Sequence, residues 1–155
     1  MEKQLKETFN YSADDARFMQ MAIDLSVDNI DTGGGPFGAV IVRDGEVIAT
    51  GTNRVVPNAD PTAHAEMQAI TAAASNIGGK YLNDCTLYVT VEPCPMCAGA
   101  IAWSQMGRVV YGAEDEKRGY HRYAPGVMHP KTEVVSGVCA DEATALMKKF
   151  FAGKR

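Results

Sequence analysis

The sequence lacks a large excess of charge of either sign. It contains 15 Lys and Arg residues and 19 Asp and Glu residues, which gives a formal net charge of -4 at pH 7. Such a balance creates no field that would gather phosphate backbones, so the composition argues mildly against nucleic acid as the main partner. It does not exclude a local basic patch.

Long apolar runs are also missing. The first seven residues are charged and lack the apolar segment of a secretory signal, and no stretch approaches the ~20 apolar residues that span a bilayer. We therefore expect a cytoplasmic protein with no membrane partner. Its 155 residues, 46% of them hydrophobic, suffice for one globular core. Because no repeat or linker divides the chain, we expect a single domain over 1–155, with 1–11 as a loosely ordered arm.

Cysteine is scarce, with four residues in the chain. In an intracellular protein such cysteines are metal ligands or free thiols more often than disulfides. Cys94 and Cys97 have the spacing of a metal-binding pair. Cys85 and Cys139 lie in apolar surroundings without a neighbouring ligand, and we expect both to be small buried thiols.

Two short segments concentrate the chemistry. They are Pro61–Glu66 and Glu92–Cys97. Together they supply the imidazole of His64, the thiols of Cys94 and Cys97, and the carboxylate of Glu66. Three such ligands suit zinc and leave a fourth position open, as is typical of catalytic zinc. The pattern predicts a hydrolytic zinc enzyme in which Glu66 moves protons as a catalytic acid and base.

A structural zinc site is the alternative interpretation. In that case Cys85, Cys139 or His129 would complete the coordination, and the domain would be a binding module that uses zinc only for folding. Glu92 adjoins the ligands, and we expect it to support the site rather than to catalyse.

The periodicity predicts strands that alternate with helices. We expect helices over 12–30 (with Ser12 and Asp15 as a capping box), from 61 or 62 to 77, from 93 to 103 and over 141–151. We expect strands over 37–43, 46–51, 86–91, 108–112 and 133–138, the first two joined by an Asp44–Gly45 hairpin turn. Residues 114–131 look irregular. This order predicts an α/β fold, a three-layer α/β/α sandwich around a mixed five-stranded sheet.

The motif His-x-Glu followed by Pro-Cys-x-x-Cys is met by His64, Glu66, Pro93, Cys94 and Cys97. It is the signature of the zinc-dependent nucleobase deaminases, and the chain resembles that superfamily from about residue 34 to its end. The resemblance implies a cytidine-deaminase-like fold, one catalytic Zn²⁺ per chain and a homodimer.

The first half is similar to bacterial guanine deaminase. The matching segments are Gly34–Val40, Asp60–Glu66 and Glu92–Cys97. This similarity implies that Phe37, Asn53 and Trp103 line the base pocket, and that Ala65 also contacts substrate. Three alternatives stay open: Phe37 as a core residue, Asn53 as a turn residue, and Trp103 as a core or dimer-contact residue.

The second half departs from that family. The stretch Gly119–Tyr123 lacks the acid that reads the substrate there, so His121 or Tyr123 either replaces that contact or faces solvent. Segments 107–113 and 129–134 and the C-terminal part are similar instead to bacterial tRNA adenosine deaminase. The basic residues that would then contact an anticodon loop, or would only form a solvated face, are Lys117, Arg118, Arg122, Lys131, Lys148 and Lys149.

We therefore expect the substrate to be a free nucleobase or small nucleoside, with guanine or a related aminopurine first and cytosine second. The alternative is a tRNA-specific adenosine deaminase that converts adenosine to inosine. The sequence leaves open which base is deaminated and whether a neighbouring subunit completes the pocket.

Overall fold

The computed structural model describes residues 11–152 and contains one mixed sheet. Its strands are β1 (Gly38–Arg43), β2 (Glu46–Thr52), β3 (Cys85–Val91), β4 (Arg108–Ala113) and β5 (Glu133–Val135). They lie in the order β2-β1-β3-β4-β5. β1 is antiparallel to β2 and β3, whereas β3, β4 and β5 run parallel. The predicted mixed five-stranded sheet is confirmed.

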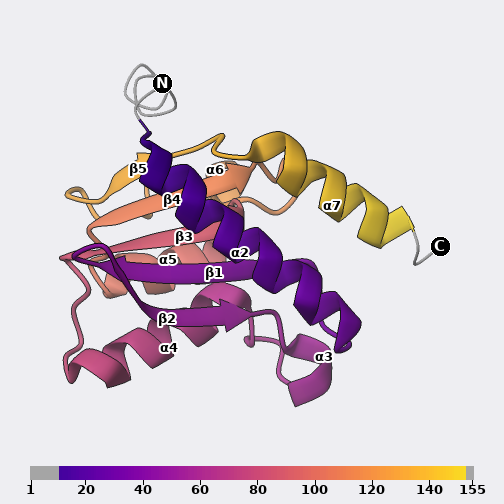
Figure 1. Ribbon diagram of the computed structural model, residues 1–155. Coiled ribbons are helices and arrows are strands. Elements are labelled where there is room, and N and C mark those ends of the chain that lie inside the picture. The colour runs from indigo at the N-terminus through magenta and orange to yellow at the C-terminus, as the bar shows by residue number, and fades with distance from the viewer. Residues whose placement is uncertain (1–10, 153–155) are drawn as a thin grey trace.

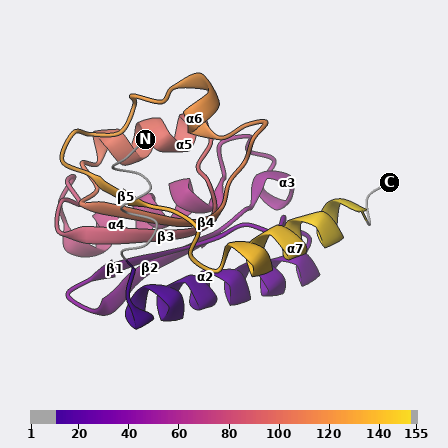
Figure 2. The ribbon, with the colours of Figure 1, turned by 90° about the horizontal axis from the view of Figure 1, so that it is seen from above.

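Helices cover both faces of this sheet. Helix α2 (Ala13–Asp31) packs against β1 and β3, and α7 (Ala140–Ala152) packs against β4 on the same face. Helix α4 (Ala65–Ile77) packs against β1 and β2 on the opposite face, beside α5 (Pro95–Trp103). Figures 1 and 2 show the three layers that result. The predicted α/β/α sandwich is therefore confirmed.

Alternating side chains of the central strands build two cores. Ile41, Leu87 and Val109 face α4 and α5, whereas Val40 and Val110 face α2. Successive residues of a strand point to opposite faces, so a strand that is apolar throughout can serve both layers. This explains why the uninterrupted run of β3 lies at the centre of the sheet.

Several helices and strands begin or end at the capping and turn residues that the sequence predicts. Ser12 and Asp15 form the predicted capping box at the start of α2. The hairpin turn between β1 and β2 consists of Asp44 and Gly45, whose φ angles are 53° and 78°. Two consecutive positive φ values match the twist of the paired strands. At the end of α4, Gly78 takes the left-handed conformation.

Other boundaries differ from the prediction. Helices α4 and α5 begin at Ala65 and Pro95, so they start later than 61 and 93. Two short helices, α3 (Val55–Asn58) and α6 (Tyr120–Tyr123), occupy segments expected to be loops, and β5 ends at Val135. One helical turn is too short to produce a readable hydrophobic period. Residues 1–10 of the predicted arm lie outside the described residues.

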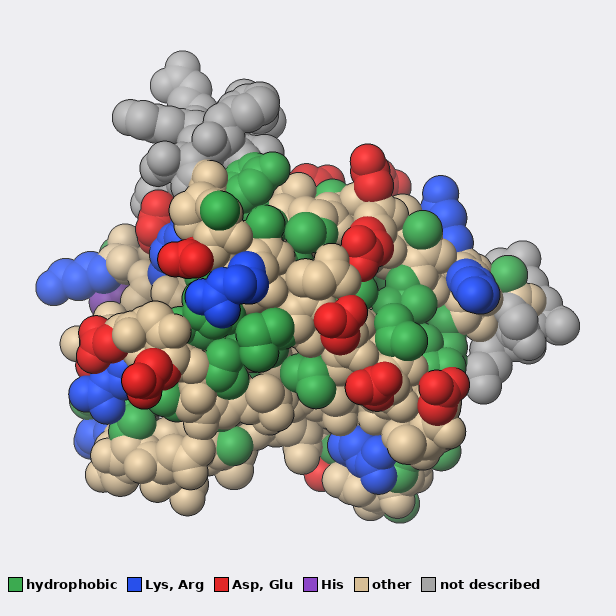
Figure 3. Space-filling view, in the orientation of Figure 1, with side chains coloured by type: hydrophobic (Ala, Val, Ile, Leu, Met, Phe, Trp, Pro, Cys, Tyr) green, Lys and Arg blue, Asp and Glu red, His purple; other side chains and the backbone are tan. Residues whose placement is uncertain are grey.

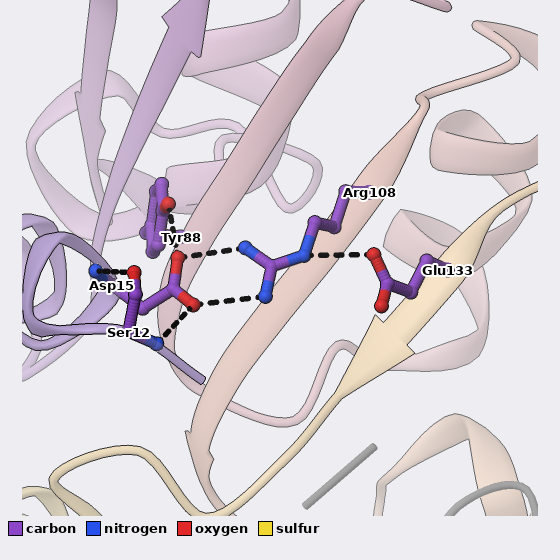
Figure 4. Close-up of polar contacts among 5 residues, drawn as sticks. All are labelled: Ser12, Asp15, Tyr88, Arg108 and Glu133. Atoms are coloured by element: carbon purple, nitrogen blue, oxygen red, sulfur yellow. Dashed lines mark hydrogen bonds and ion pairs between the residues drawn. The ribbon is translucent and has the colours of Figure 1, made fainter. Parts of the chain in front are cut away.

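A partly buried ionic network ties α2 to three strands (Figure 4). The Arg108 guanidinium donates two hydrogen bonds to the Asp15 carboxylate, at 2.7 and 2.8 Å, and a third to Glu133 at 2.9 Å. The Tyr88 hydroxyl donates to the same Asp15 carboxylate at 2.6 Å. Burial by itself would raise the pKa of Asp15, but the hydrogen bonds from Arg108 and Tyr88 outweigh it and lower that pKa to about 2.

The outer surface of the α2 and α7 layer is mixed in character. Figure 3 shows acidic and basic side chains interspersed on this face, with hydrophobic side chains gathered between the C-terminal half of α2 and α7. Between residues 11 and 152, no helix combines the length and apolar character that crossing a membrane requires.

Candidate metal centre and substrate cavity

Two helix N-termini bring the predicted metal ligands together. His64 is the N-cap of α4 and Cys94 the N-cap of α5, while Cys97 lies in the first turn of α5. The Sγ atoms of Cys94 and Cys97 lie 3.6 and 3.5 Å from Nδ1 of His64. A helix that began at residue 61 or 62, as predicted, would have placed His64 inside its first turn. In the structure His64 lies directly before the helix.

Close packing of α4 on the sheet fixes the position of His64. A Cβ atom added at Gly51 of β2 would collide with the backbone oxygen of Ala65, at the start of α4. Only glycine therefore lets the helix approach so closely. On the other side, Pro95 occupies the first position of α5, where the absence of a backbone N–H costs nothing.

The donor set matches zinc geometrically. Zinc binds thiolate at ~2.3 Å and imidazole nitrogen at ~2.05 Å, so tetrahedral coordination places such a sulfur and nitrogen roughly 3.6 Å apart. The distances from His64 to Cys94 and Cys97, 3.6 and 3.5 Å, meet this requirement. Among the described residues, neither Cys85, Cys139 nor His129 joins the group, which leaves the fourth position open.

The electrostatics favour one anionic sulfur, that of Cys94, at this position. In the metal-free protein, the hydrogen bond from Cys97 lowers the pKa of Cys94 to about 4, with a further contribution from His64. The same thiol pair raises the pKa of Cys97, and the hydrogen bond with Cys94 raises that of His64. Two helix N-termini add partial positive charge. The site is therefore suited to a metal cation that replaces the protons held between Cys94, Cys97 and His64.

Glu66 lies in the first turn of α4, and only 6% of it is exposed. Burial raises the pKa of its carboxyl group to about 7. A carboxyl group with such a pKa can both accept and release a proton near neutral pH, which is the property that a general acid and base requires.

Phe37 and Asn53 line one cavity of about 850 Å³ between α2, α3 and α7. The backbone N–H of Asn53 donates to the carbonyl oxygen of Phe37 at 3.3 Å, and Arg54 N–H donates to Ala63 O at 2.8 Å, directly before His64. The side-chain Oδ1 of Asn53 accepts from Val55 N at 3.3 Å. Within residues 11–152, no group accepts a hydrogen bond from its Nδ2.

The other predicted substrate contacts lie elsewhere. Ala65 is fully buried and does not line this cavity. Trp103 is 85% exposed and Tyr123 62% exposed, and neither lines this cavity. The alternative of Trp103 as a core residue is therefore wrong. His121 borders a separate hollow of about 380 Å³ with Glu92 and other acids.

Glu92 holds the loop that carries His121. Its carboxylate accepts hydrogen bonds from Asp115 N and His121 N, at 3.2 and 3.0 Å, and contacts His121 Nδ1 at 3.1 Å. This is the supporting role expected for Glu92. Nothing in the sequence identified its partners, because the loop is over 20 positions away.

The cysteines outside the centre differ from one another. Cys85 is 2% exposed, and its Sγ lies 3.5 Å from Asp84 Oδ1, so the expected buried thiol is confirmed there. Cys139 is only partly buried and has a positive φ of 56°. Cys139 was expected to be a small buried thiol, and the structure shows it partly buried instead.

An α/β/α sandwich whose helix N-termini present one histidine, two cysteines and a buried glutamate defines a zinc-dependent hydrolase. Residues 12–113 match the model of the cytidine and deoxycytidylate deaminase zinc-binding region. The chain belongs to this deaminase family, with Zn²⁺ as its cofactor. The alternative of a binding module that uses zinc only for folding is not supported.

Individual relatives have two different activities. The chain is 51% identical over 98 residues to guanine deaminase of Bacillus subtilis, a match that covers 63% of this chain and 63% of that protein, less than two thirds of its length. It is 41% identical over 147 residues to the tRNA-specific adenosine deaminase of Haemophilus influenzae, which covers 91% of this chain and 85% of that protein.

A solved structure of guanine deaminase from Nitrosomonas europaea has a TM-score of 0.80 and 31% identity to this chain. The match covers 88% of this chain and 84% of that one. The fold and the family are therefore shared with guanine deaminases and with a tRNA-specific adenosine deaminase.

Proposed function

We propose that this enzyme deaminates a free nucleobase or a small nucleoside by hydrolysis, with guanine or a related aminopurine as the favoured substrate and cytosine as a second candidate. The observation that carries the proposal is that Phe37 and Asn53 line one cavity. His64, Glu66, Cys94 and Cys97 do not line it, but the backbone hydrogen bond from Arg54 N to Ala63 O joins the segment after Asn53 to the residue before His64. An aromatic face suits stacking on a base, and an amide can both donate to and accept from a base edge.

The proposed chemistry replaces an exocyclic amine by oxygen. Zn²⁺ held by His64, Cys94 and Cys97 would lower the pKa of a coordinated water toward neutrality. Glu66 accepts one proton from water and delivers it to the adjacent ring nitrogen. It then takes the second proton from the added hydroxyl group and delivers it to the departing amine. Water is consumed and ammonia is released, so that a C–NH₂ group becomes C=O without any redox partner.

Asn53 provides the first test of substrate recognition. Changing Asn53 to Ala removes the open amide and leaves the polar edge of the base unpaired. We expect kcat/KM to fall by roughly 10- to 1000-fold. The control is Asn58→Ala, an exposed amide nearby in the same segment. If steady-state kinetics give equal values for both variants, Asn53 is a turn residue and not a substrate contact.

The alternative function is deamination of adenosine to inosine in tRNA. It is favoured by the relative from Haemophilus influenzae, whose similarity extends over 91% of this chain. The net charge of -4 and the interspersed acids in Figure 3 do not favour it.

Ammonia release separates the two functions. The zinc-loaded protein is assayed against guanine, cytosine, adenine, their nucleosides, related aminopurines and pterins, and a tRNA anticodon arm. Turnover of a free base or nucleoside supports the proposal. Turnover of the RNA alone replaces it by the alternative, and would make Phe37 a core residue rather than a base contact.

We also propose that the enzyme is a homodimer formed through α5. This helix is apolar on two sides: Cys97, Ala98 and Ile101 face the core, whereas Met96 and Trp103 are exposed. Met96 and Trp103 are seven positions apart and share one helical face, with Gly99 and Ala100 between them. An exposed tryptophan on such a stripe is typical of a protein interface.

Changing Trp103 to Glu is expected to weaken the dimer at least roughly 30-fold, as for the loss of an interface hot spot worth about 2 kcal/mol. Sedimentation equilibrium measures the change. Tyr81→Glu alters another exposed aromatic, 45% exposed, and serves as the control. A wild-type protein that sediments as a monomer would refute the proposal.

A further inference from the structure

Asn29 lies in the last turn of α2, where only 5% of it is exposed. Its side-chain Nδ2 donates two hydrogen bonds, to Asn53 O at 2.8 Å and to Gly35 O at 3.0 Å. Its Oδ1 accepts from Arg54 Nη1 at 3.4 Å. One amide therefore joins two segments that are far apart in the sequence, and both lead directly to proposed base contacts.

The joined backbone is closely packed at Gly34. A Cβ atom added at Gly34 would collide with the Asn29 amide and approach Asn53 O at 2.6 Å. Gly34 N–H also donates to the backbone oxygen of Asn29 at 2.9 Å. Since Gly35 precedes Phe37 by two residues, the position of this aromatic ring depends on where the glycine segment is held.

A purely structural role for Asn29 predicts that it only ends α2. That task, however, is performed by its backbone: Asn29 O accepts from Thr32 N at 3.1 Å, from Gly34 N at 2.9 Å and from the Thr32 hydroxyl at 3.0 Å. These bonds do not involve the side chain and survive its replacement. The Asn29 side-chain amide therefore bonds only to groups outside α2: the Asn53 and Gly35 carbonyls and the Arg54 guanidinium.

We propose that Asn29 is a positioning residue for substrate recognition. It sets the distance between Asn53 and Phe37 and so orients the base between an amide and an aromatic ring. This inference rests on the proposed function of Asn53 and Phe37. A displacement of a substrate-binding group by about 1 Å can lower catalytic efficiency about 100-fold without any loss of the reacting groups.

The test compares Asn29→Ala with wild type on the substrate identified in the ammonia-release assay. We expect kcat/KM to fall roughly 10- to 100-fold, mainly through a higher KM, with one zinc per chain retained. Amide hydrogen exchange over residues 33–37 and 53–55 should become faster. The isosteric Asn29→Asp variant, which points an oxygen at both carbonyls, should be at least as impaired.

A double-mutant cycle distinguishes positioning from general destabilisation. In the Asn53→Ala background, replacing Asn29 should lower kcat/KM less than about 3-fold further, because its main target is already gone. Asn76→Ala is the matched control, since its amide donates to Ile48 O at 2.6 Å far from the cavity. If Asn29→Ala fails to fold, Asn29→Ser, whose hydroxyl is too short to reach both carbonyls, is measured in its place.

Each outcome is decisive. Wild-type kinetics in Asn29→Ala, or a loss in kcat/KM that multiplies fully with that of Asn53→Ala, overturns the positioning role while leaving the proposed function intact. Absence of turnover by the wild-type protein on every free base and nucleoside of the panel refutes the proposed function instead. Unchanged hydrogen exchange in the glycine segment also contradicts the inference.

Discussion

Replacing Glu66 by Gln is expected to lower kcat by about 10²- to 10⁴-fold, the usual range for a lost general acid and base. The amide keeps the size and hydrogen-bonding surface of the side chain but cannot carry the proton from water to the ring nitrogen and the amine. Because Glu66 is not one of the three donor residues around the metal position, zinc content should remain one per chain. Metal analysis and steady-state kinetics on the same preparation measure both quantities.

The companion variant is Cys97→Ala. It removes a donor from the group of three, so zinc and activity should be lost together. Glu66→Gln therefore separates proton transfer from metal binding, and Cys97→Ala does not. Loss of zinc in Glu66→Gln would make this carboxylate a ligand, and wild-type turnover in that variant would remove it from the mechanism.

The largest expected effect on stability comes from Arg108. Changing it to Met leaves the Asp15 carboxylate buried, 4% exposed, without its ionic partner. Breaking a buried pair on one side costs about 3–5 kcal/mol of unfolding free energy. Urea denaturation measures the loss. Arg17→Met is the control, since its pair with Asp14 is long, 3.5 Å, and exposed.

The same network predicts an acid-sensitive stability. The folded-state pKa of Asp15 is lowered from 3.8 to about 2, so its contribution of about 2 kcal/mol is present above pH 4. It is lost as the pH falls through 4 toward 2, because the unfolded chain then binds a proton that the folded chain does not. In Arg108→Met this part of the acid dependence should shrink; an unchanged profile would contradict the assignment.

Local patterns predicted most of the architecture because each depends on residues close in the chain. The Asp44–Gly45 turn has the φ angles that only such residues adopt readily, and the Ser12–Asp15 box satisfies its own backbone groups. The predicted first residues of α4 and α5 were less accurate than these features. There the chain places His64 and Cys94 in extended N-cap geometry, directly before the first helical residue.

The substrate contacts stay predictions. Phe37 and Asn53 were assigned by resemblance, and the structure places both along one cavity. Trp103 was assigned in the same way but is 85% exposed, since α5 turns that face away from the core. Asn29 carried no signal at all, because an asparagine near the end of a helix is ordinary. Its role depends on two carbonyl groups that only folding brings near.

The sequence by itself determined the metal-binding chemistry and the class of fold. Ligand identity and spacing within His64–Glu66 and Cys94–Cys97 are local, and alternating apolar residues define the layers. Tertiary structure decided which side chains share the cavity, what Glu92 and Asn29 hold, and that Arg108 pairs with Asp15. These contacts join distant segments, and their geometry arises only when the sheet and both helical layers pack together.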